Sequence, residues 1–170
     1  MRKTVLTYGL ISGILSSAMM LATIPFIDRL DGRKGEIFGY TAILLVALLV
    51  FFGVRSYREN VGNGRITFGR GFAVGILITL ISCAFYVVTW EVLYYGVMPD
   101  LGDKMTAAMV SKAKASGGSP EEIAEAERRA QSFKKLYDNP AVNVAFTFIE
   151  PFPIGLVVTA LSAAILRRPK

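Results

Sequence analysis

Four apolar stretches, separated by clusters of charged residues, form the main pattern along the chain. They cover about residues 4–27, 37–54, 71–97 and 141–166, and the first two contain no charged side chain. The third is interrupted only by Glu91 and the fourth only by Glu150. A membrane-spanning helix needs about 20 mainly apolar residues, and these stretches lack the polar face that a soluble helix turns toward water. The pattern therefore predicts an all-α integral membrane protein, a four-helix bundle in a single domain of residues 1–170.

The first stretch has a signal peptide as its alternative interpretation, because Arg2 and Lys3 precede it. Its apolar run of about 24 residues exceeds the roughly 7 to 15 residues of a signal-peptide core. Residues 24–27 also offer no small-residue cleavage pattern. We therefore expect a retained helix.

Two pairs of glycines in these stretches are spaced four residues apart. Gly9 and Gly13 lie in the first stretch, and Gly71 and Gly75 begin the third. Small residues at this spacing let neighbouring helices approach closely. We expect them to pack within the chain, with a dimer contact as the alternative.

Residue types that usually carry chemistry are scarce. The chain has no histidine and a single cysteine, Cys83, in the third apolar stretch. This excludes an intrachain disulfide, histidine-based metal sites and histidine general bases, and it makes a structural zinc site implausible. We expect no cofactor, no metal ion and no enzymatic activity, since a membrane enzyme would have only the two membrane carboxylates to use.

Basic residues decide the expected orientation. Nine lysines and arginines lie in the two tails and the middle loop, and ten lie in the other two loops. Most of the nine adjoin helix ends, and Glu59 is the only acidic residue in the tails and middle loop. The other two loops each contain equal numbers of acidic and basic residues. Positive charge near helix ends favours the cytoplasmic side, where anionic lipids lie. We predict that both termini lie in the cytoplasm and that no nucleic acid is a partner.

The middle loop, residues 55–70, is the basic segment between the second and third helices. It contains Asn63-Gly64, a strong tight-turn signal. Aromatic and arginine side chains collect at the level of lipid headgroups. The candidate headgroup contacts in this loop are Arg55, Tyr57, Arg58 and Arg70.

The long loop, residues 98–140, is expected to form an extracytoplasmic helical hairpin between the third and fourth membrane helices. A first helix would run to about Ala115 and stop at Gly117-Gly118. Ser119, Pro120 and Glu122 then supply an N-cap, a proline at the first helical position and a capping-box glutamate for a second helix. The apolar residues expected to face inward are Leu101, Met105, Ala108 or Met109, Ile123, Ala126, Ala130, Phe133 and Tyr137. The hairpin either packs on itself and the bilayer rim or also serves as a docking cap for an extracytoplasmic partner.

Glu91 and Glu150 are the candidate functional residues inside the membrane, together with Pro151 and Pro153 beside the second glutamate. A charged side chain in hydrocarbon is costly, so such residues usually face protein, water or the interface. Two prolines remove backbone donors and should kink the fourth helix, and a carboxyl beside a broken helix is typical of ion-coupling sites. The alternative is structural, with Glu91 at the interface and Glu150 hydrogen-bonded to a neighbour. Suitable neighbours are Tyr86 and Thr147.

Several motifs follow one another in an order that resembles a known bacterial family. They are Phe38-Gly39-Tyr40, Gly53 with Tyr57-Arg58, the Gly62/Gly64 turn with Phe68, Tyr86, Trp90, Met98-Pro99-Asp100, Tyr137 with Asn139-Pro140, and Glu150-Pro151-x-Pro153-x-Gly155. The family is catalogued as a domain of unknown function with the serial number four thousand one hundred and ninety-nine. The resemblance covers nearly the whole chain, implies a small four-helix inner-membrane protein, and brings no activity, cofactor or catalytic residue.

These features favour a non-enzymatic membrane protein, a structural or assembly subunit that presents the hairpin outside and the basic loop inside. Its expected partners are the lipid bilayer, anionic headgroups on the cytoplasmic side, and a membrane protein or further copies of the chain. The alternative is a small transporter or channel subunit that uses Glu150 and Glu91. Because four helices are few for a transporter, this alternative requires a homo-oligomer.

Overall fold

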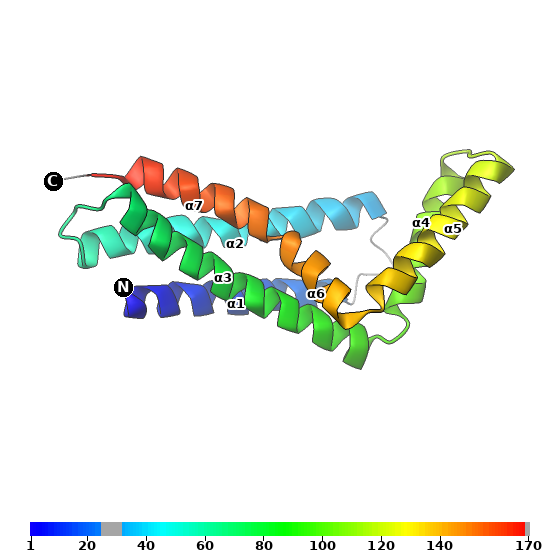
Figure 1. The fold of residues 1–170 in the computed structure, drawn as a ribbon, viewed down its shortest axis with the longest axis horizontal. Helices are drawn as coiled ribbons and strands as arrows, with labels where there is room; N and C mark the ends of the chain where they lie inside the picture. Colours follow the sequence, from blue (N-terminus) through cyan, green and yellow to red (C-terminus); the bar gives the residue numbers. More distant parts are fainter. Residues whose placement is uncertain (25–31, 169–170) are drawn as a thin grey trace. The chain divides into compact units, whose positions relative to one another are not determined.

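The computed structural model of the chain describes residues 1–24 and 32–168, which are helical apart from connecting segments and one isolated β-bridge (Figure 1). The elements are α1 (Arg2–Thr23), α2 (Gly32–Asn60), α3 (Phe68–Val92), the short π-helical turn η2 (Leu93–Val97), α4 (Leu101–Ala115), α5 (Pro120–Tyr137), α6 (Pro140–Ile149) and α7 (Phe152–Leu166). The predicted helix residues 25–27 and predicted loop residues 28–31 lie outside the described residues. The all-α prediction is confirmed.

Four described segments are long and apolar enough to cross a membrane: Arg2–Thr23, Ile37–Asn60, Phe68–Val97 and Pro140–Leu166. They coincide with the four apolar stretches of the sequence, so the chain is a multi-pass membrane protein. Both boundaries of the second helix differ from the prediction, since α2 begins at Gly32 instead of residue 37 and ends well beyond residue 54. The charge of Arg55 predicts the end of the second helix there, but α2 continues to Asn60. The extension is stable because Tyr57 still packs in the apolar core and Arg55 pairs with Glu59 one turn later (3.0 Å).

Two compact units make up the described chain. The bundle unit lies within Met1–Val87 and Phe148–Lys170 and contains α1, α2, α7 and most of α3. The hairpin unit, Val88–Thr147, contains α4, α5 and most of α6. The predicted four-helix bundle and the predicted hairpin between the third and fourth spans are both present.

Small and hydroxyl-bearing residues form part of the interior of the bundle unit. Thr159 of α7 is fully buried, and its hydroxyl shares a hydrogen bond with that of Thr79 on α3 (3.1 Å). Many large apolar side chains lie on the outside, among them Ile14, which is 60% exposed, and Ile165, which is 70% exposed. Lipid solvates such side chains, and close helix packing in membranes relies on small residues. The arrangement therefore fits a bundle built for hydrocarbon surroundings.

Glycines at the predicted spacing bring the helices of the bundle unit together. A Cβ atom at Gly9 would lie 2.8 Å from Ile81, and one at Gly13 would lie 2.6 Å from Phe85, so α1 approaches α3 closely. Gly75 faces α7 in the same way. The expected packing of these glycines within the chain is confirmed.

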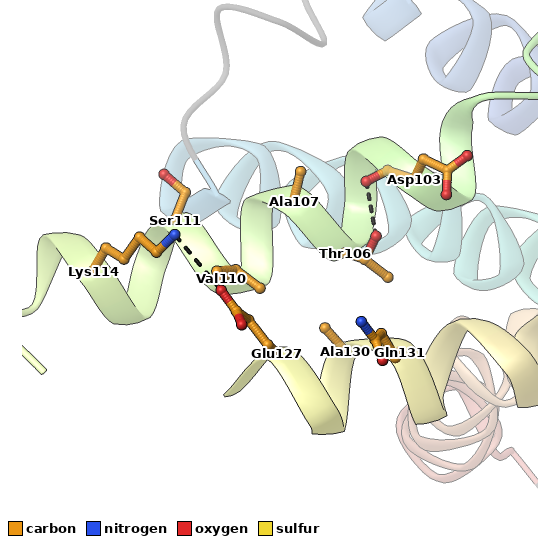
Figure 2. Close-up of a pocket in the computed structure, with 9 residues that line it drawn as sticks. All are labelled: Asp103, Thr106, Ala107, Val110, Ser111, Lys114, Glu127, Ala130 and Gln131. Carbon is orange, nitrogen blue, oxygen red and sulfur yellow. Dashed lines mark hydrogen bonds and ion pairs between the residues drawn. The ribbon is translucent and has the colours of Figure 1, made fainter. Parts of the chain in front are cut away.

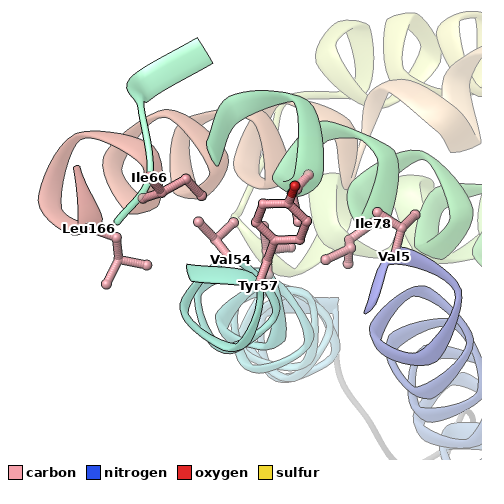
Figure 3. Packing of buried hydrophobic residues seen from close by; sticks show 8 residues of the cluster. Val5, Val54, Tyr57, Ile66, Ile78 and Leu166 are labelled. Atoms are coloured by element: carbon pink, nitrogen blue, oxygen red, sulfur yellow. The ribbon is translucent and has the colours of Figure 1, made fainter. Parts of the chain in front are cut away.

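An apolar core of the bundle unit joins all four of its helices and the loop between α2 and α3 (Figure 3). Ile66 of the loop is 4% exposed and Leu166 at the end of α7 is 5% exposed. The buried members are Val5, Val50, Val54, Tyr57, Ile66, Val74, Ile78 and Leu166. The loop is therefore anchored in the core by its own side chain.

A tight turn and a β-bridge shape the same loop. Asn63 (φ 49°) and Gly64 (φ 80°) both have positive φ, which confirms the predicted turn and which these two residue types adopt most readily. The Ile66 N–H donates to the Arg168 carbonyl (3.1 Å), and the Arg168 N–H donates to the Ile66 carbonyl (2.9 Å). This antiparallel bridge ties the residues after α7 to the residues before α3.

The α4–α5 hairpin begins its second helix as the sequence predicts. The Ser119 hydroxyl accepts from the Glu122 N–H (3.3 Å), and the Glu122 carboxylate accepts from the Ser119 N–H (2.7 Å). The capping box is therefore confirmed. Gly117 has φ 74° in the turn before it, a conformation that favours glycine.

The inward faces of the hairpin follow the prediction on α5 and in part on α4, where Leu101 is buried as expected. Ala130 and Tyr137 of α5 are buried, as expected. On α4, Ala108 and Met109 are exposed, so their expected inward position is wrong. Thr106 and Val110 line the space toward α5 instead (Figure 2).

Candidate functional site at the base of the hairpin

Asn143, near the start of α6, is fully buried and connects three elements of the hairpin unit. Its Oδ1 accepts hydrogen bonds from Trp90 Nε1 on α3 (2.9 Å) and from the Thr147 hydroxyl one turn along α6 (3.2 Å). Its Nδ2 donates to the backbone carbonyl of Tyr137 at the end of α5 (3.2 Å). Because each partner would lose a hydrogen bond in apolar surroundings, the amide favours one arrangement of the three helices.

Asp138, the residue after α5, forms a second centre of hydrogen bonds. Its Oδ1 accepts from the Tyr94 hydroxyl of η2 (2.7 Å), and its Oδ2 accepts from Lys134 Nζ one turn back on α5 (3.1 Å). The Tyr95 hydroxyl donates to the backbone carbonyl of Asp138 (3.2 Å). Lys134 also lies 3.4 Å from Asp103 on α4. One carboxylate thus connects η2 and α5 directly and α4 through the lysine.

The partners of Asp138 also set its charge. Asp138 lies outside the four candidate spans. The hydrogen bond from the Tyr94 hydroxyl, together with that from the Lys134 ammonium, stabilises the carboxylate and lowers the pKa of Asp138. The carboxylates of Asp138 and Asp103 raise the pKa of Lys134 in turn. Both members of the ion pair are therefore charged at neutral pH.

Aromatic rings fill the space between these two centres. The Tyr137 ring, which is buried, has its centroid 5.0 Å from that of Phe133, 5.5 Å from that of Tyr94 and 6.5 Å from that of Trp90. The contacts with Tyr94 and Trp90 are edge-to-face, a favoured geometry for aromatic pairs. The name junction is used below for Trp90, Tyr94, Tyr137, Asp138 and Asn143. The junction connects the residues before α4 to the residues at the end of α5, and so holds the two ends of the hairpin together within its unit.

Glu91 follows Trp90 on α3 and differs from the junction residues in its bonding. Its Oε1 is buried and has no hydrogen-bond partner among the described residues. Buried polar atoms nearly always have a partner. The atom therefore has unused capacity to bind a proton or a cation.

Glu150 belongs to the bundle unit and lies at a break in the fourth span. α6 ends one residue before it and α7 begins two residues after it, with Pro151 as the N-cap of α7 and Pro153 in its first turn. The predicted interruption by the prolines is confirmed. The carboxylate accepts a hydrogen bond from the Tyr86 hydroxyl of α3 (3.0 Å), one of the two neighbours expected in the structural alternative.

The predicted headgroup contacts differ in their surroundings. Arg55 and Arg58 share one carboxylate oxygen of Glu59, at 3.0 Å and 3.1 Å. Tyr57 is a member of the apolar core and is 7% exposed. Arg70 is exposed. The exposed arginines of the bundle unit that have no carboxylate partner within residues 1–24 and 32–168 are Arg2, Arg65, Arg70, Arg167 and Arg168.

An open groove of about 530 Å³ lies between α4 and α5 (Figure 2). Lys114 and Glu127 face each other across it, with Nζ and Oε1 3.7 Å apart. The lining residues are Asp103, Thr106, Ala107, Val110, Ser111, Lys114, Glu127, Ala130 and Gln131. In the part of the chain that the structure describes, no group of three His, Cys, Asp or Glu side chains is placed to hold a metal ion.

Comparison with known proteins supports the resemblance seen in the sequence. A family model described as "Protein of unknown function (DUF4199)" matches residues 7–168. The chain belongs to this family. The match includes the last three candidate spans, most of the first, and the hairpin of this DUF4199 protein. No curated protein and no solved structure matches the chain.

Two central residues of the junction in this DUF4199 protein are not among the sequence-based candidates. Asn143 is a lone amide near the start of an apolar stretch, and that isolation is the signal that points to a buried, fully bonded group. Asp138 is one of seven acidic residues in its loop, and nothing in its spacing distinguishes it from the others. The motif residues Trp90 and Tyr137, which carry the resemblance, meet in the junction with ring centroids 6.5 Å apart.

Proposed function

We propose that this protein is a non-enzymatic structural or assembly subunit of the bacterial inner membrane, and that the α4–α5 hairpin is its working surface. The observation that carries the proposal is the junction. The side chain of Asn143 makes three hydrogen bonds, and the carboxylate of Asp138 accepts hydrogen bonds from η2 and α5. The polar groups at the base of the hairpin therefore fix its position within its unit. A surface that is ordered before binding loses less conformational freedom on binding, which favours recognition of a partner.

The hairpin offers the partner a defined surface. Ala107, Ser111 and Gln131 are exposed along the groove, and the Lys114–Glu127 pair supplies one charge of each sign. Small side chains at the groove leave room for the side chains of an approaching helix. The proposed occupant is a membrane protein partner or a further copy of the chain.

The proposed orientation places both termini and the loop after α2 in the cytoplasm and the hairpin outside. It rests on the nine basic residues of the tails and middle loop, which have only Glu59 beside them. Single cysteines at Asn63 and Ser116, in a Cys83→Ala background, test it with an impermeant thiol reagent on intact cells. Labelling at Ser116 and none at Asn63 is expected, and the opposite pattern contradicts the orientation.

Copurification in mild detergent tests the assembly role. The wild-type chain should elute as a discrete complex larger than a monomer, with a reproducible set of proteins identified by mass spectrometry or with copies of itself. Asn143→Leu should release that complex while the circular dichroism of the helices is kept. Glu125→Gln is the matched control, because Glu125 is exposed, pairs with Arg129 on the same helix and does not line the groove between α4 and α5. A wild-type monomer, or a complex that Asn143→Leu leaves intact, contradicts the proposal.

A homo-oligomeric transporter or channel that uses Glu150 and Glu91 is the second candidate function. The observation that favours it is the buried Oε1 of Glu91, which has no partner among the described residues. Purified protein in vesicles with a pH-sensitive dye tests it under gradients of both signs. Flux that Glu91→Gln or Glu150→Gln abolishes supports coupling, whereas wild-type flux equal to that of empty vesicles removes this candidate.

A further inference from the structure

We infer that Arg65, Arg167 and Arg168 form a binding site for the phosphate group of an anionic lipid headgroup, assembled by the β-bridge between the loop before α3 and the residues after α7. The site lies in the bundle unit. It does not depend on the assembly role proposed for the hairpin.

The bridge brings together arginines that are far apart in the sequence. Ile66 and Arg168 exchange both backbone hydrogen bonds, at 3.1 Å and 2.9 Å. Such an antiparallel pair places its two Cα atoms about 5.5 Å apart. Arg168 is one member of the pair. Arg65 directly precedes Ile66 in the chain, and Arg167 directly precedes Arg168.

The backbone that carries these arginines is held by the core below it. Ile66 and Leu166 are 4% and 5% exposed and belong to one apolar cluster with Val54 and Tyr57 (Figure 3). Each of the two bridged segments is therefore anchored by a buried side chain as well as by hydrogen bonds. An anion bound here needs to order the arginine side chains but not the backbone, which lowers the entropic cost of binding.

The charges of the site are available to a ligand. Arg65, Arg167 and Arg168 are exposed, and none has a carboxylate partner within the described ranges. Arg55 and Arg58 of the same unit differ, because both are paired with Glu59. The bridge brings three positively charged residues close together along the backbone, and a bound anion lowers the repulsion between like charges. Guanidinium forks also bind phosphate oxygens in pairs, which a lysine ammonium does not.

The position of the arginines along the chain favours a lipid over a soluble anion. Arg167 directly follows Leu166, the last residue of a candidate span, and Arg65 lies three residues before Phe68, the first residue of another. Residues at the ends of membrane helices lie at the level of the headgroups. Phospholipid phosphates are therefore the anions nearest to the site.

Native mass spectrometry of the full-length protein in mild detergent tests the site. The probe is phosphatidylglycerol, and phosphatidylcholine with the same acyl chains is the reference lipid. The wild-type protein should retain the anionic lipid in preference to the reference, and the preference should fall as sodium chloride is added. The combined change Arg65→Gln, Arg167→Gln and Arg168→Gln should lower phosphatidylglycerol occupancy by at least about tenfold, since losing a charge-assisted hydrogen bond has an effect of this order.

The matched control removes three basic charges outside the site, by Arg2→Gln, Lys3→Gln and Arg128→Gln, all of which are exposed. It should change occupancy by no more than about twofold, because exposed charges outside the site act only through a screened field. Equal losses in the two triple variants overturn the site. If the first triple variant does not fold, Arg65→Gln and Arg168→Gln are measured singly, and occupancy unchanged in both overturns the site as well.

Two further arms separate the anion source and the role of the bridge. Excess inorganic phosphate should leave phosphatidylglycerol bound, and displacement by phosphate overturns the lipid assignment. Arg168→Gln keeps the N–H that donates to the Ile66 carbonyl, whereas Arg168→Pro removes it. The proline variant should bind the lipid more weakly than the glutamine variant. Equal binding by the two contradicts assembly of the site by the bridge.

Discussion

Replacing Asn143 by leucine should open the base of the hairpin. Leucine has a similar volume but no polar atoms, so Trp90 Nε1 and the Tyr137 carbonyl both lose their partner. The Thr147 hydroxyl also loses Asn143 but remains 3.3 Å from the Tyr137 hydroxyl, with which it can share a hydrogen bond. The expected damage therefore comes mainly from two unsatisfied groups.

The magnitude follows from those two groups. A buried donor or acceptor left without a partner costs about 1–3 kcal/mol, so the pair costs roughly 2–6 kcal/mol and about 3 kcal/mol is a central expectation. Trp90→Phe removes only one donor and leaves Asn143 Oδ1 bonded to Thr147 (3.2 Å), so it should cost about 1 kcal/mol. We therefore predict that Asn143→Leu destabilises the hairpin unit clearly more than Trp90→Phe does.

Hydrogen exchange followed by mass spectrometry measures this difference segment by segment. A loss of about 3 kcal/mol corresponds to exchange faster by roughly a hundredfold in peptides from α5 and α6, where local opening limits exchange. Peptides from α2, in the bundle unit, should keep their rates. The reasoning would be refuted if hydrogen exchange in α5 and α6 were no faster in the Asn143→Leu variant than in the Trp90→Phe variant. It would also be refuted if exchange in α2 were accelerated equally.

Three further predictions concern other parts of the chain. Ser119→Ala should weaken the start of α5 by about 1 kcal/mol through loss of the cap, measured by the helicity of a peptide covering residues 118–139 with and without the change. The hydrogen bond from the Tyr94 hydroxyl is the main cause of the lowered pKa of Asp138, so the charged carboxylate stabilises the fold at pH values above its ordinary pKa of 3.8. This contribution is lost as the pH falls through the lower pKa of the folded state. Hydrogen exchange of α5, corrected for intrinsic rates, should therefore become faster at acidic pH, and Asp138→Asn should remove that change. Gly13→Val should destabilise the bundle unit by about 1–3 kcal/mol, because its Cβ would lie 2.6 Å from the Phe85 ring, and the thermal unfolding midpoint in detergent would show it.

Much of the fold can be predicted from the sequence because the relevant signals are local. Apolar length predicts the spans, Ser119 and Glu122 predict a capping box, and Asn63-Gly64 predicts a turn whose two residues both have positive φ. Each of these depends on residues within a few positions of one another. The prolines after Glu150 act in the same way, since a missing backbone donor interrupts the helix where it occurs.

The junction and the arginine site cannot be predicted in this way because they depend on pairs distant in the chain. Trp90 and Asn143 meet only when α3 and α6 are folded, and neither has a sequence neighbour that predicts the pairing. The bridge between Ile66 and Arg168 joins a loop to the end of the last helix, and single hydrogen-bonded pairs leave no periodic pattern. The end of α2 at Asn60 is missed for a related reason, since a charged residue at 55 predicts a boundary that the core contact of Tyr57 overrides.

Photo-crosslinking from the groove in intact cells tests most directly whether the hairpin is the working surface of an assembly subunit. A photoreactive residue replaces Gln131, which lines the groove, or Arg128, which is exposed on α5 and does not line it. Gln131 should give a discrete adduct of constant mass that disappears in an Asn143→Leu background, and Arg128 should give little of it. No adduct at Gln131, or equal yields of the same adduct from both positions, would contradict the proposed role of the hairpin.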